Sequence, residues 1–300
     1  VADFLVQLFH ASSPGQPGDS LTVRALLDRG VRRIETQPPD DPYVRARLLA
    51  AISDSYLNLE QFDAGLRVTR AALAAAESAR PRDDVEVARG LDRLANGLSM
   101  AGMPDSVPPL VERTLGLLRA HPGADPGLLA SALYRKARYR LDAGALAEAD
   151  SLLDLSLEAA QSATPPDPAA LARSYGTRAL LASWRYDFDH AAADYTRALD
   201  YSIRAQEPMR TAGLHGALAS TFLGQGRPDS ALVHARRGVE MARRLYAPTH
   251  SSLAEALGGL AEVLSGLRRY PEAIAAQEEA VRILRGRDKR SDLLPYSLAV

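Results

Sequence analysis

Residues Thr249 to Arg287 read THSSLAEALGGLAEVLSGLRRYPEAIAAQEEAVRILRGR, and this stretch decides the fold. Apolar residues recur at steps of three and four on both sides of LRRYP, which predicts two amphipathic helices joined by a short turn. Pro271 suits the first turn of the second helix, because no backbone hydrogen bond is lost there. Small Ala261 and Ala273 stand where two antiparallel helices could cross closely. The stretch therefore predicts a helical hairpin.

The same pattern returns along nearly the whole chain. One position of the second helix serves as an anchor and holds Gly65, Val107, Ala149, Ala191, Ala231 and Ala273, evenly spaced except for a slightly shorter step between Ala191 and Ala231. The partner position, twelve residues earlier, holds Ser53, Ala95, Ala137, Ala179, Ala219 and Ala261. A third position, seven residues after the anchor, holds Ala72, Thr114, Ser156, Ala198, Gly238 and Ala280. One hairpin cannot bury its own apolar face, so the spacing predicts six hairpins that stack.

We therefore expect an all-α fold, a right-handed α-solenoid that forms one elongated domain over residues 43–300. Its hairpins are predicted at residues 43–80, 85–121, 126–163, 168–205, 208–247 and 249–287, and residues 291–300 are predicted to begin a further helix. Residues 1–42 are predicted to form an N-terminal helix, a loop and a capping helix that covers the first hairpin. Pro108 and Pro109 are expected to delay or kink the second helix of the second hairpin.

This arrangement resembles the tetratricopeptide repeat in a long form of about forty residues, as in repeats of the kinesin light chain type. Beside the small positions, the residues that carry the resemblance are Gly102, Gly144 and Gly226 at the turn and Leu49, Leu133, Tyr175 and Leu257 toward the core. The resemblance covers roughly residues 43–287. It implies a scaffold that binds protein or peptide rather than an enzyme, although the fold alone does not fix the function.

The N-terminal part of the chain, residues 1–65, is similar to the segment that follows the catalytic domain in bacterial serine/threonine protein kinases with C-terminal tetratricopeptide arrays. The matching residues are Phe4, Leu8, Phe9, Pro14, Thr22, Arg24, Leu26, Leu27, Asp28, Arg29, Gly30, Arg33 and Ile34. The resemblance implies a regulatory region in signalling, with a kinase domain in cis before Val1. The chain itself has no VAIK-type lysine and no HRD motif, and Asp187-Phe188-Asp189 is not DFG, so we do not expect it to phosphorylate a substrate.

The composition gives no general reason to expect nucleic acid or an anionic membrane as a partner. The 300 residues carry a formal net charge of −1 with a pI near 6.7. The chain has no cysteine, and hence no disulfide framework or thiolate site. We see no apolar run long enough for a membrane span and no cleavable leader, and we expect a cytoplasmic location.

The histidines do not form a recognisable motif. His10, His121, His190, His215, His234 and His250 have no HExxH or other paired spacing, and we interpret them as linker or helix-face residues. We therefore expect no metal site, no cofactor and no catalytic residue in this chain.

The candidate binding residues lie on the concave side, which the first helix of each hairpin lines in tetratricopeptide stacks. Transferring the groove positions of the family gives Arg47, Arg89, Arg93, Asn96, Tyr134, Arg135, Arg138, Arg173, Thr177 and Trp184. Guanidinium groups bind carboxylate or phosphate in a bidentate manner, and the two aromatic residues could clamp a side chain. The groove is thus predicted to bind an acidic or phosphorylated segment.

Alternatives remain open at this point. The arginines could simply pair with Asp54, Asp92, Asp142 and neighbouring glutamates, and Trp184 could equally be a core residue. The array could also be a structural or oligomerising spacer, or a stand-alone peptide-sensing regulator. A last feature is the set of helical glycines in the final two hairpins, Gly213, Gly216, Gly224, Gly258, Gly259 and Gly266. Since glycine costs a helix about 1 kcal/mol relative to alanine, they predict close backbone approach, either between hairpins or by a bound chain.

Overall fold

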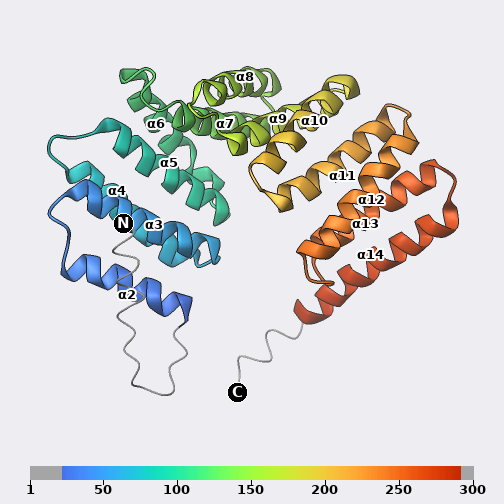
Figure 1. The fold of residues 1–300 in the computed structure, drawn as a ribbon, viewed down its shortest axis with the longest axis horizontal. Coiled ribbons are helices and arrows are strands. Elements are labelled where there is room, and N and C mark those ends of the chain that lie inside the picture. Colours follow the sequence, from blue (N-terminus) through green and yellow to red (C-terminus); the bar gives the residue numbers. More distant parts are fainter. Residues whose placement is uncertain (1–21, 292–300) are drawn as a thin grey trace, which may run out of the picture. The chain divides into compact units, whose positions relative to one another are not determined.

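The computed structural model of the protein describes residues 22–291, with side chains as far as Arg285. In this part of the chain there are thirteen α-helices and one short 3₁₀ helix and no strand (Figure 1). These residues form two compact units, with the boundary between Ala145 and Leu146. No described helix is long and apolar enough to cross a membrane. The helices predicted at residues 1–10 and after residue 291 lie outside the described residues.

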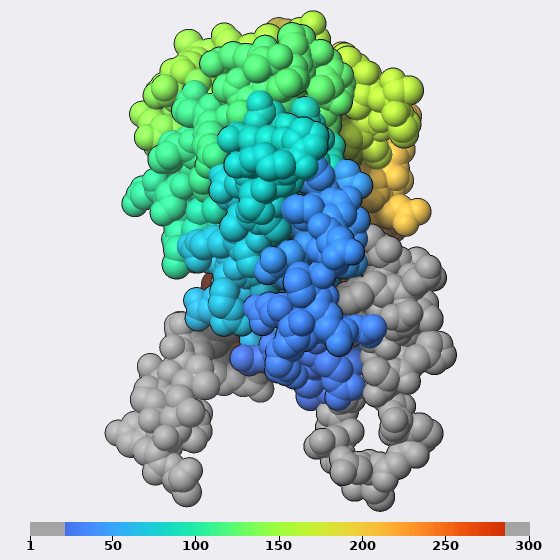
Figure 2. Space-filling view, turned by 90° about the vertical axis from the view of Figure 1, so that its left-hand side faces the viewer, coloured from blue at the N-terminus to red at the C-terminus, as the bar shows by residue number. Residues whose placement is uncertain are grey.

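Unit 1 is a stack of antiparallel helices. It contains α2 (Val23–Thr36), α3 (Pro42–Asn58), α4 (Phe62–Ser78), α5 (Asp84–Met100), the 3₁₀ helix η1 (Pro104–Ser106), α6 (Pro108–Ala120) and α7 (Pro126–Asp142). Helix α3 pairs with α4 and α5 with α6, while α4 packs on α5 and α6 on α7. In Figure 2 the colours of this unit pass in order from blue through cyan to green, because each hairpin packs on the next.

The predicted capping helix is present as α2. Its Val31 and Ile34 are buried in one core cluster with Leu49, Ile52 and Tyr56 of α3. The Tyr56 hydroxyl donates to Asp28 Oδ1 of α2 at 2.6 Å, so a polar contact supplements the apolar ones. Helix α2 therefore covers the face of the first hairpin that would otherwise be open.

Unit 2 repeats the same arrangement. It contains α8 (Leu146–Ser162), α9 (Pro168–Trp184), α10 (Phe188–Arg204), α11 (Pro208–Gly224), α12 (Pro228–Leu245), α13 (Ser251–Gly266) and α14 (Tyr270–Ser291). Helices α9 and α10, α11 and α12, and α13 and α14 form hairpins, and α8 packs on α9. Proline at the first or second position of α9, α11 and α12 starts these helices without loss of a hydrogen bond.

The small positions behave as the sequence predicts. All six anchors and all six partner residues are buried, and Ala137, Ala149, Ala179, Ala191 and Ala231 are fully inaccessible to solvent. The residues seven positions after the anchors are buried as well, from Ala72 to Ala280. Within each unit, helices can approach closely at these points because no long side chain separates them.

A left-handed residue closes each hairpin turn, five positions before the anchor. These residues are Glu60, Gly102, Gly144, Tyr186, Gly226 and Arg268, with φ between 58° and 76°. The next N–H then bonds to the carbonyl five residues back, as from Gln61 to Tyr56 at 2.9 Å. Only three of the six are glycines, so three turns hold a side chain in a conformation that L-residues disfavour.

The second hairpin departs from the pattern as expected. Its second helix, α6, begins only at Pro108, after the 3₁₀ turn of η1, and has 13 residues where α5 has 17. The two prolines lie in the first turn, where they fit, so the helix is delayed rather than kinked.

Candidate peptide-binding surface

The first helices of unit 1 form a hollow lined by arginines. Its volume is about 310 Å³, and it lies among α3, α4 and α5. Small residues such as Ala50, Ala72 and Gly90 line it. Its charged groups are Arg47, Asp54, Glu86, Arg89 and Arg93, and we call it the arginine hollow. The lining thus holds three cations and two carboxylates, and a third carboxylate, Asp125, pairs with Arg89 from outside the lining.

Each of these arginines has a carboxylate partner. Arg47 pairs with Glu86, and Arg89 Nη1 donates to the same carboxylate at 2.8 Å. Arg89 Nη2 also donates to Asp125 at 2.6 Å. Burial acts to lower the pKa of Arg89, but hydrogen bonding to Asp125 and the charge of Glu86 outweigh it and raise the pKa above its ordinary value.

Arg93 Nε donates to Asp54 at 3.0 Å, so a second contact joins α3 to α5. The Arg93 side chain is 29% exposed and that of Asp54 is 48% exposed, and the pair is thus in contact with solvent. Exposed pairs of this kind contribute about 0–1 kcal/mol to stability. A stronger acceptor could therefore replace Asp54 at small cost.

Arg135 of α7 has a more buried carboxylate partner than Arg93 has. Its Nε donates to Asp92 at 2.9 Å, and its Nη1 donates to Asn96 at 3.3 Å. The side chains of Arg135 and Asp92 are each only 15% exposed. Arg138 lies 3.7 Å from Asp142 on the same helix. The carboxylate pairing that the sequence left open as an alternative is thus present for Asp54, Asp92 and Asp142.

The remaining predicted residues have varied surroundings. Tyr134 on α7 and Arg173 on α9 are half-buried and interact with other groups of the protein. Thr177 is buried, with 7% exposure, so its hydroxyl does not lie on the open surface. Trp184 at the end of α9 is 52% exposed, which does not fit the alternative that it is a core residue.

A spacing in the sequence could have located the carboxylate partners. Four contacts join residues 39 apart, and they are Arg47 to Glu86, Asp54 to Arg93, Asp92 to Ser131 and Asn96 to Arg135. This spacing is about one helical turn shorter than the period of the repeat. It therefore marks positions that face each other on successive first helices.

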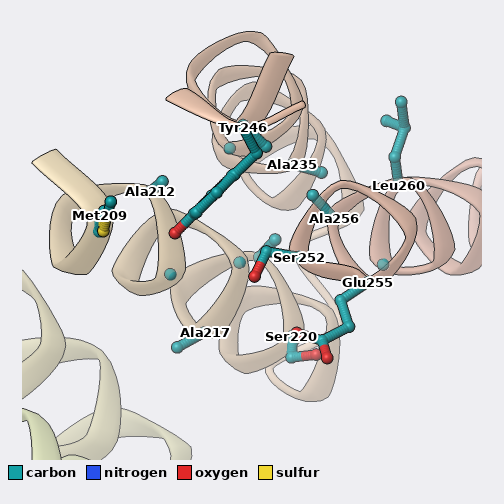
Figure 3. A pocket seen from close by; sticks show the side chains of 16 residues that line it. Met209, Ala212, Ala217, Ser220, Ala235, Tyr246, Ser252, Glu255, Ala256 and Leu260 are labelled. Atoms are coloured by element: carbon teal, nitrogen blue, oxygen red, sulfur yellow. The ribbon is translucent and has the colours of Figure 1, made fainter. Parts of the chain in front are cut away.

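A second hollow lies in unit 2 among α11, α12 and α13 (Figure 3). Its volume is about 470 Å³, and Gly213, Gly216 and Gly259 are among its lining residues. A Cβ added at any of these three, or at Gly258, would meet no atom within 4 Å. The prediction of close approach between hairpins is therefore wrong for these four glycines. Gly224 and Gly266 do have close neighbours, but these are side chains and not backbone: their added Cβ atoms would lie 2.7 Å from the Phe188 ring and 3.0 Å from Leu223.

This glycine hollow also has polar groups at its edge. Figure 3 shows Tyr246, from the end of α12, reaching across the hollow, with Ser252 and Glu255 of α13 facing it. Glu255 is exposed to solvent. Sequence reasoning found the glycines but not these polar residues, although Glu255 stands at the repeat position that Arg47, Arg89 and Arg173 occupy in earlier hairpins. The described residues contain no group of three or more histidine, aspartate or glutamate side chains that could hold a metal ion.

The comparisons with known proteins agree with this architecture. Residues 210–286 match the family described as tetratricopeptide repeat. The chain is similar in structure to BtubC (BKLC) from P. vanneervenii, with 17% identity, a TM-score of 0.63 and coverage of 76% of this chain and 92% of that chain. It is also similar to a Rap protein complexed with Competence and Sporulation Factor, with 14% identity, a TM-score of 0.60 and coverage of 81% and 67%.

A third similar structure is a signal transduction ATPase with numerous domains, carrying a tetratricopeptide repeat sensor, from Pyrococcus horikoshii. It has 14% identity and a TM-score of 0.66, and the match covers 89% of this chain but 41% of that chain. No curated protein matches the chain in sequence.

The likenesses confirm the expected fold class, an α-solenoid of tetratricopeptide-like hairpins. Such arrays typically bind other proteins on an extended surface and have no catalytic centre, which is the coarse function that the family match supports.

Proposed function

We propose that this chain is a non-catalytic scaffold that binds an acidic or phosphorylated segment of a partner protein in the arginine hollow of unit 1. The observation that carries the proposal is the convergence of Arg47, Arg89 and Arg93 on one hollow of about 310 Å³. A phosphate or a pair of carboxylates matches the fork of donors that each guanidinium group presents. The small residues of the hollow leave room for the backbone of the bound segment.

The existing ion pairs set the order in which arginines would engage a ligand. Arg93 shares only an exposed carboxylate, so it can turn to a new anion at a cost of about 1 kcal/mol or less. Arg47 is 61% exposed, but it would leave Glu86, which is 10% exposed and keeps Arg89 as a partner. Arg135 would have to leave a partly buried carboxylate, which costs more. We therefore assign the first contact to Arg93, further contacts to Arg47 and Arg89, which already share Glu86, and a supporting role to Arg135.

A binding titration tests this assignment. Fluorescence anisotropy of an acidic phosphoserine peptide pool is measured with the full chain, at low and at high salt. We expect Arg47→Glu and Arg93→Glu to weaken binding tenfold or more, since each reverses one contact charge. Arg70→Glu is the matched control, because Arg70 is exposed on α4 of the same hairpin and does not line the hollow. Equal affinity for all three variants, or no binding by the wild type, would exclude the arginine hollow as the binding site.

The biological setting is a further part of the proposal. The resemblance of residues 1–65 supports a regulatory region of a bacterial serine/threonine protein kinase, and the sensor array in the Pyrococcus ATPase is a parallel for such a role. The reading frame upstream of Val1 tests it: a glycine-rich loop, HRD and DFG would support the link, and their absence would refute it. A stand-alone peptide-sensing regulator is the alternative, for which the Rap protein with its bound factor is the parallel.

A structural or oligomerising spacer is the second candidate function. The observation that favours it is the exposed apolar face of α14, where Tyr270, Ile274 and Leu284 are 57%, 58% and 47% exposed. Static light scattering over a range of concentrations separates the two functions. A strictly monomeric chain that binds the peptide pool supports the scaffold, whereas assembly that Ile274→Glu prevents supports the spacer.

A further inference from the structure

Two histidines that lie far apart in the sequence meet inside the fifth hairpin. His215 of α11 and His234 of α12 are both half-buried, and their Nδ1 atoms are 3.0 Å apart. The ring centroids are separated by 5.2 Å, with the ring planes inclined by 40°. Both are helix-face residues, as the sequence indicates, but the contact between them was not predicted from the sequence. The residues are 19 apart, and the predicted crossing of Ala219 with Ala231 is the signal that could have located the pair, since each histidine stands about one turn from it.

The position of the pair is fixed by the hairpin. Ala219 and Ala231 are fully or nearly fully buried at the crossing of the two helices, about one turn from the histidines. The hairpin turn is closed by the left-handed Gly226 and by the bond from the Arg227 N–H to the Phe222 carbonyl, at 2.9 Å. The rings are thus held by two rigid helices rather than by a loop.

Both rings are neutral at neutral pH. Burial, together with the charges of His234 and Arg237, lowers the pKa of His215 to about 4, and burial lowers the pKa of His234. In the neutral pair one Nδ1–H donates to the other Nδ1. If the donating ring moves its proton to Nε2, both Nδ1 lone pairs point into the same space, and no proton is lost to solvent.

We propose that His215 and His234 form a two-histidine binding site for a single Cu²⁺ or Zn²⁺ ion. Imidazole nitrogen suits these ions. With metal–nitrogen bonds of about 2.0–2.1 Å, two ligand nitrogens lie about 2.9 Å apart when the nitrogen–metal–nitrogen angle is a right angle, and about 3.3 Å apart when it is tetrahedral. The observed 3.0 Å lies between these values, so the two nitrogens already have a suitable separation, and the rings turn away from the hydrogen-bond direction until both lone pairs point to the ion. Water fills the remaining positions, because the described residues offer no third histidine or carboxylate at this place.

The residues around the two histidines predict how substitutions should change the affinity for the metal ion. The Phe222 ring lies 5.4 Å from the His234 ring and covers it on one side. Arg237 stands one turn after His234, and its positive charge adds to burial in lowering the pKa of His215. Its Nη1 donates to Glu240 at 2.8 Å. Its positive charge disfavours a bound cation, so Arg237→Gln should tighten metal binding, while Glu240→Gln should weaken it.

Metal binding by the untagged full chain tests the site. Cu²⁺ alone or Zn²⁺ alone is titrated by calorimetry, and the Cu²⁺ form is examined by electron paramagnetic resonance. We expect one ion per chain, a spectrum with two nitrogen donors, and a loss of affinity of about tenfold or more in His215→Gln and in His234→Gln. His190→Gln is the matched control, because His190 is exposed and its ring pairs with the neighbouring Asp187. The control variant should bind as the wild type does.

Three results would overturn the site: no saturable binding, a spectrum without two nitrogen donors, or equal affinity in the wild type and the His215→Gln variant. The spectrum of the wild type is decisive even if a variant does not fold, since it counts nitrogen donors without any substitution. The test is independent of peptide binding, because the arginine hollow and the histidine pair lie in different units.

Discussion

One arginine of unit 2 holds two carboxylates of very different burial, and this contrast gives a sharp prediction. Arg178 of α9 donates to Asp194 of α10 through Nε at 2.7 Å and Nη2 at 3.0 Å. It also donates to Asp154 of α8 through Nη1 at 2.6 Å. The Asp194 side chain is 8% exposed and that of Asp154 is 61% exposed. Hydrogen bonding to Asp194 is the largest cause that raises the pKa of Arg178 above its ordinary value.

We predict that Asp194→Asn lowers the free energy of unfolding by about 3 kcal/mol. Removing one member of a buried pair costs about 3–5 kcal/mol, and the lower end applies because Arg178 keeps Asp154 and is itself 25% exposed. Arg197 also loses its charged partner, since its Nη1 donates to Asp194 at 3.0 Å. Asp154→Asn removes only an exposed contact and should cost about 0.5 kcal/mol or less.

Urea unfolding at pH 7, followed by Trp184 fluorescence, measures the difference. Trp184 is the only tryptophan and lies at the end of α9, the helix that carries Arg178. Similar midpoints for the two variants would refute the reasoning that burial decides the strength of these contacts. A large effect of Asp154→Asn alone would refute it as well.

Three further predictions rest on turns, glycines and pH. Gly102→Ala should lower the melting temperature by removing about 1 kcal/mol, and Glu60→Gly at the equivalent turn should raise it slightly. In chemical unfolding, Gly216→Ala should stabilise the chain by about 0.5–1 kcal/mol, because the added Cβ enters open space. Gly224→Ala should destabilise it by about 1–3 kcal/mol, because the added Cβ would lie 2.7 Å from the Phe188 ring. The folded-state pKa of His215 lies below its unfolded value, so the free energy of unfolding should fall by about 2 kcal/mol as the pH drops from 6.5 to 4. Urea unfolding measures this change, and His215→Gln should flatten the pH dependence.

The sequence predicts the hairpins well because their packing depends on residue size at a constant interval. Ala179 and Ala191, for example, are both found fully buried at the positions that the spacing assigns to the crossing. Sequence reasoning recognises the turns only in part. Gly102 is an obvious turn residue, but Tyr186 takes the same left-handed conformation without any sign in its chemistry. The closure of the hairpin imposes that conformation on whichever residue stands there.

The site is harder to predict, because it depends on which groups meet across helices. The arginines can be placed on the first helices by transfer of the repeat positions, but their partners depend on the offset between successive repeats. Arg89 reaches Asp125 at the start of α7, a contact that no local pattern indicates. The histidine pair is different, because the predicted crossing of Ala219 and Ala231 places the two rings about one turn away on facing sides, and the contact could have been predicted from it.

The spacing of 39 between facing charges has a consequence for how such an array can change length. If residues 83–124, one full period, were excised, Arg47 would stand opposite Asp125 as Arg89 does now, and Asp54 would take the place of Asn96 opposite Arg135. Lys136 would not keep a partner, because Glu112, now 2.7 Å away, would be excised and Arg70 stands one period before it. Loss of this period during evolution would therefore preserve the two arginine contacts but leave Lys136 and Glu77 without their present partners, so a change in repeat number requires compensating substitutions at the junction.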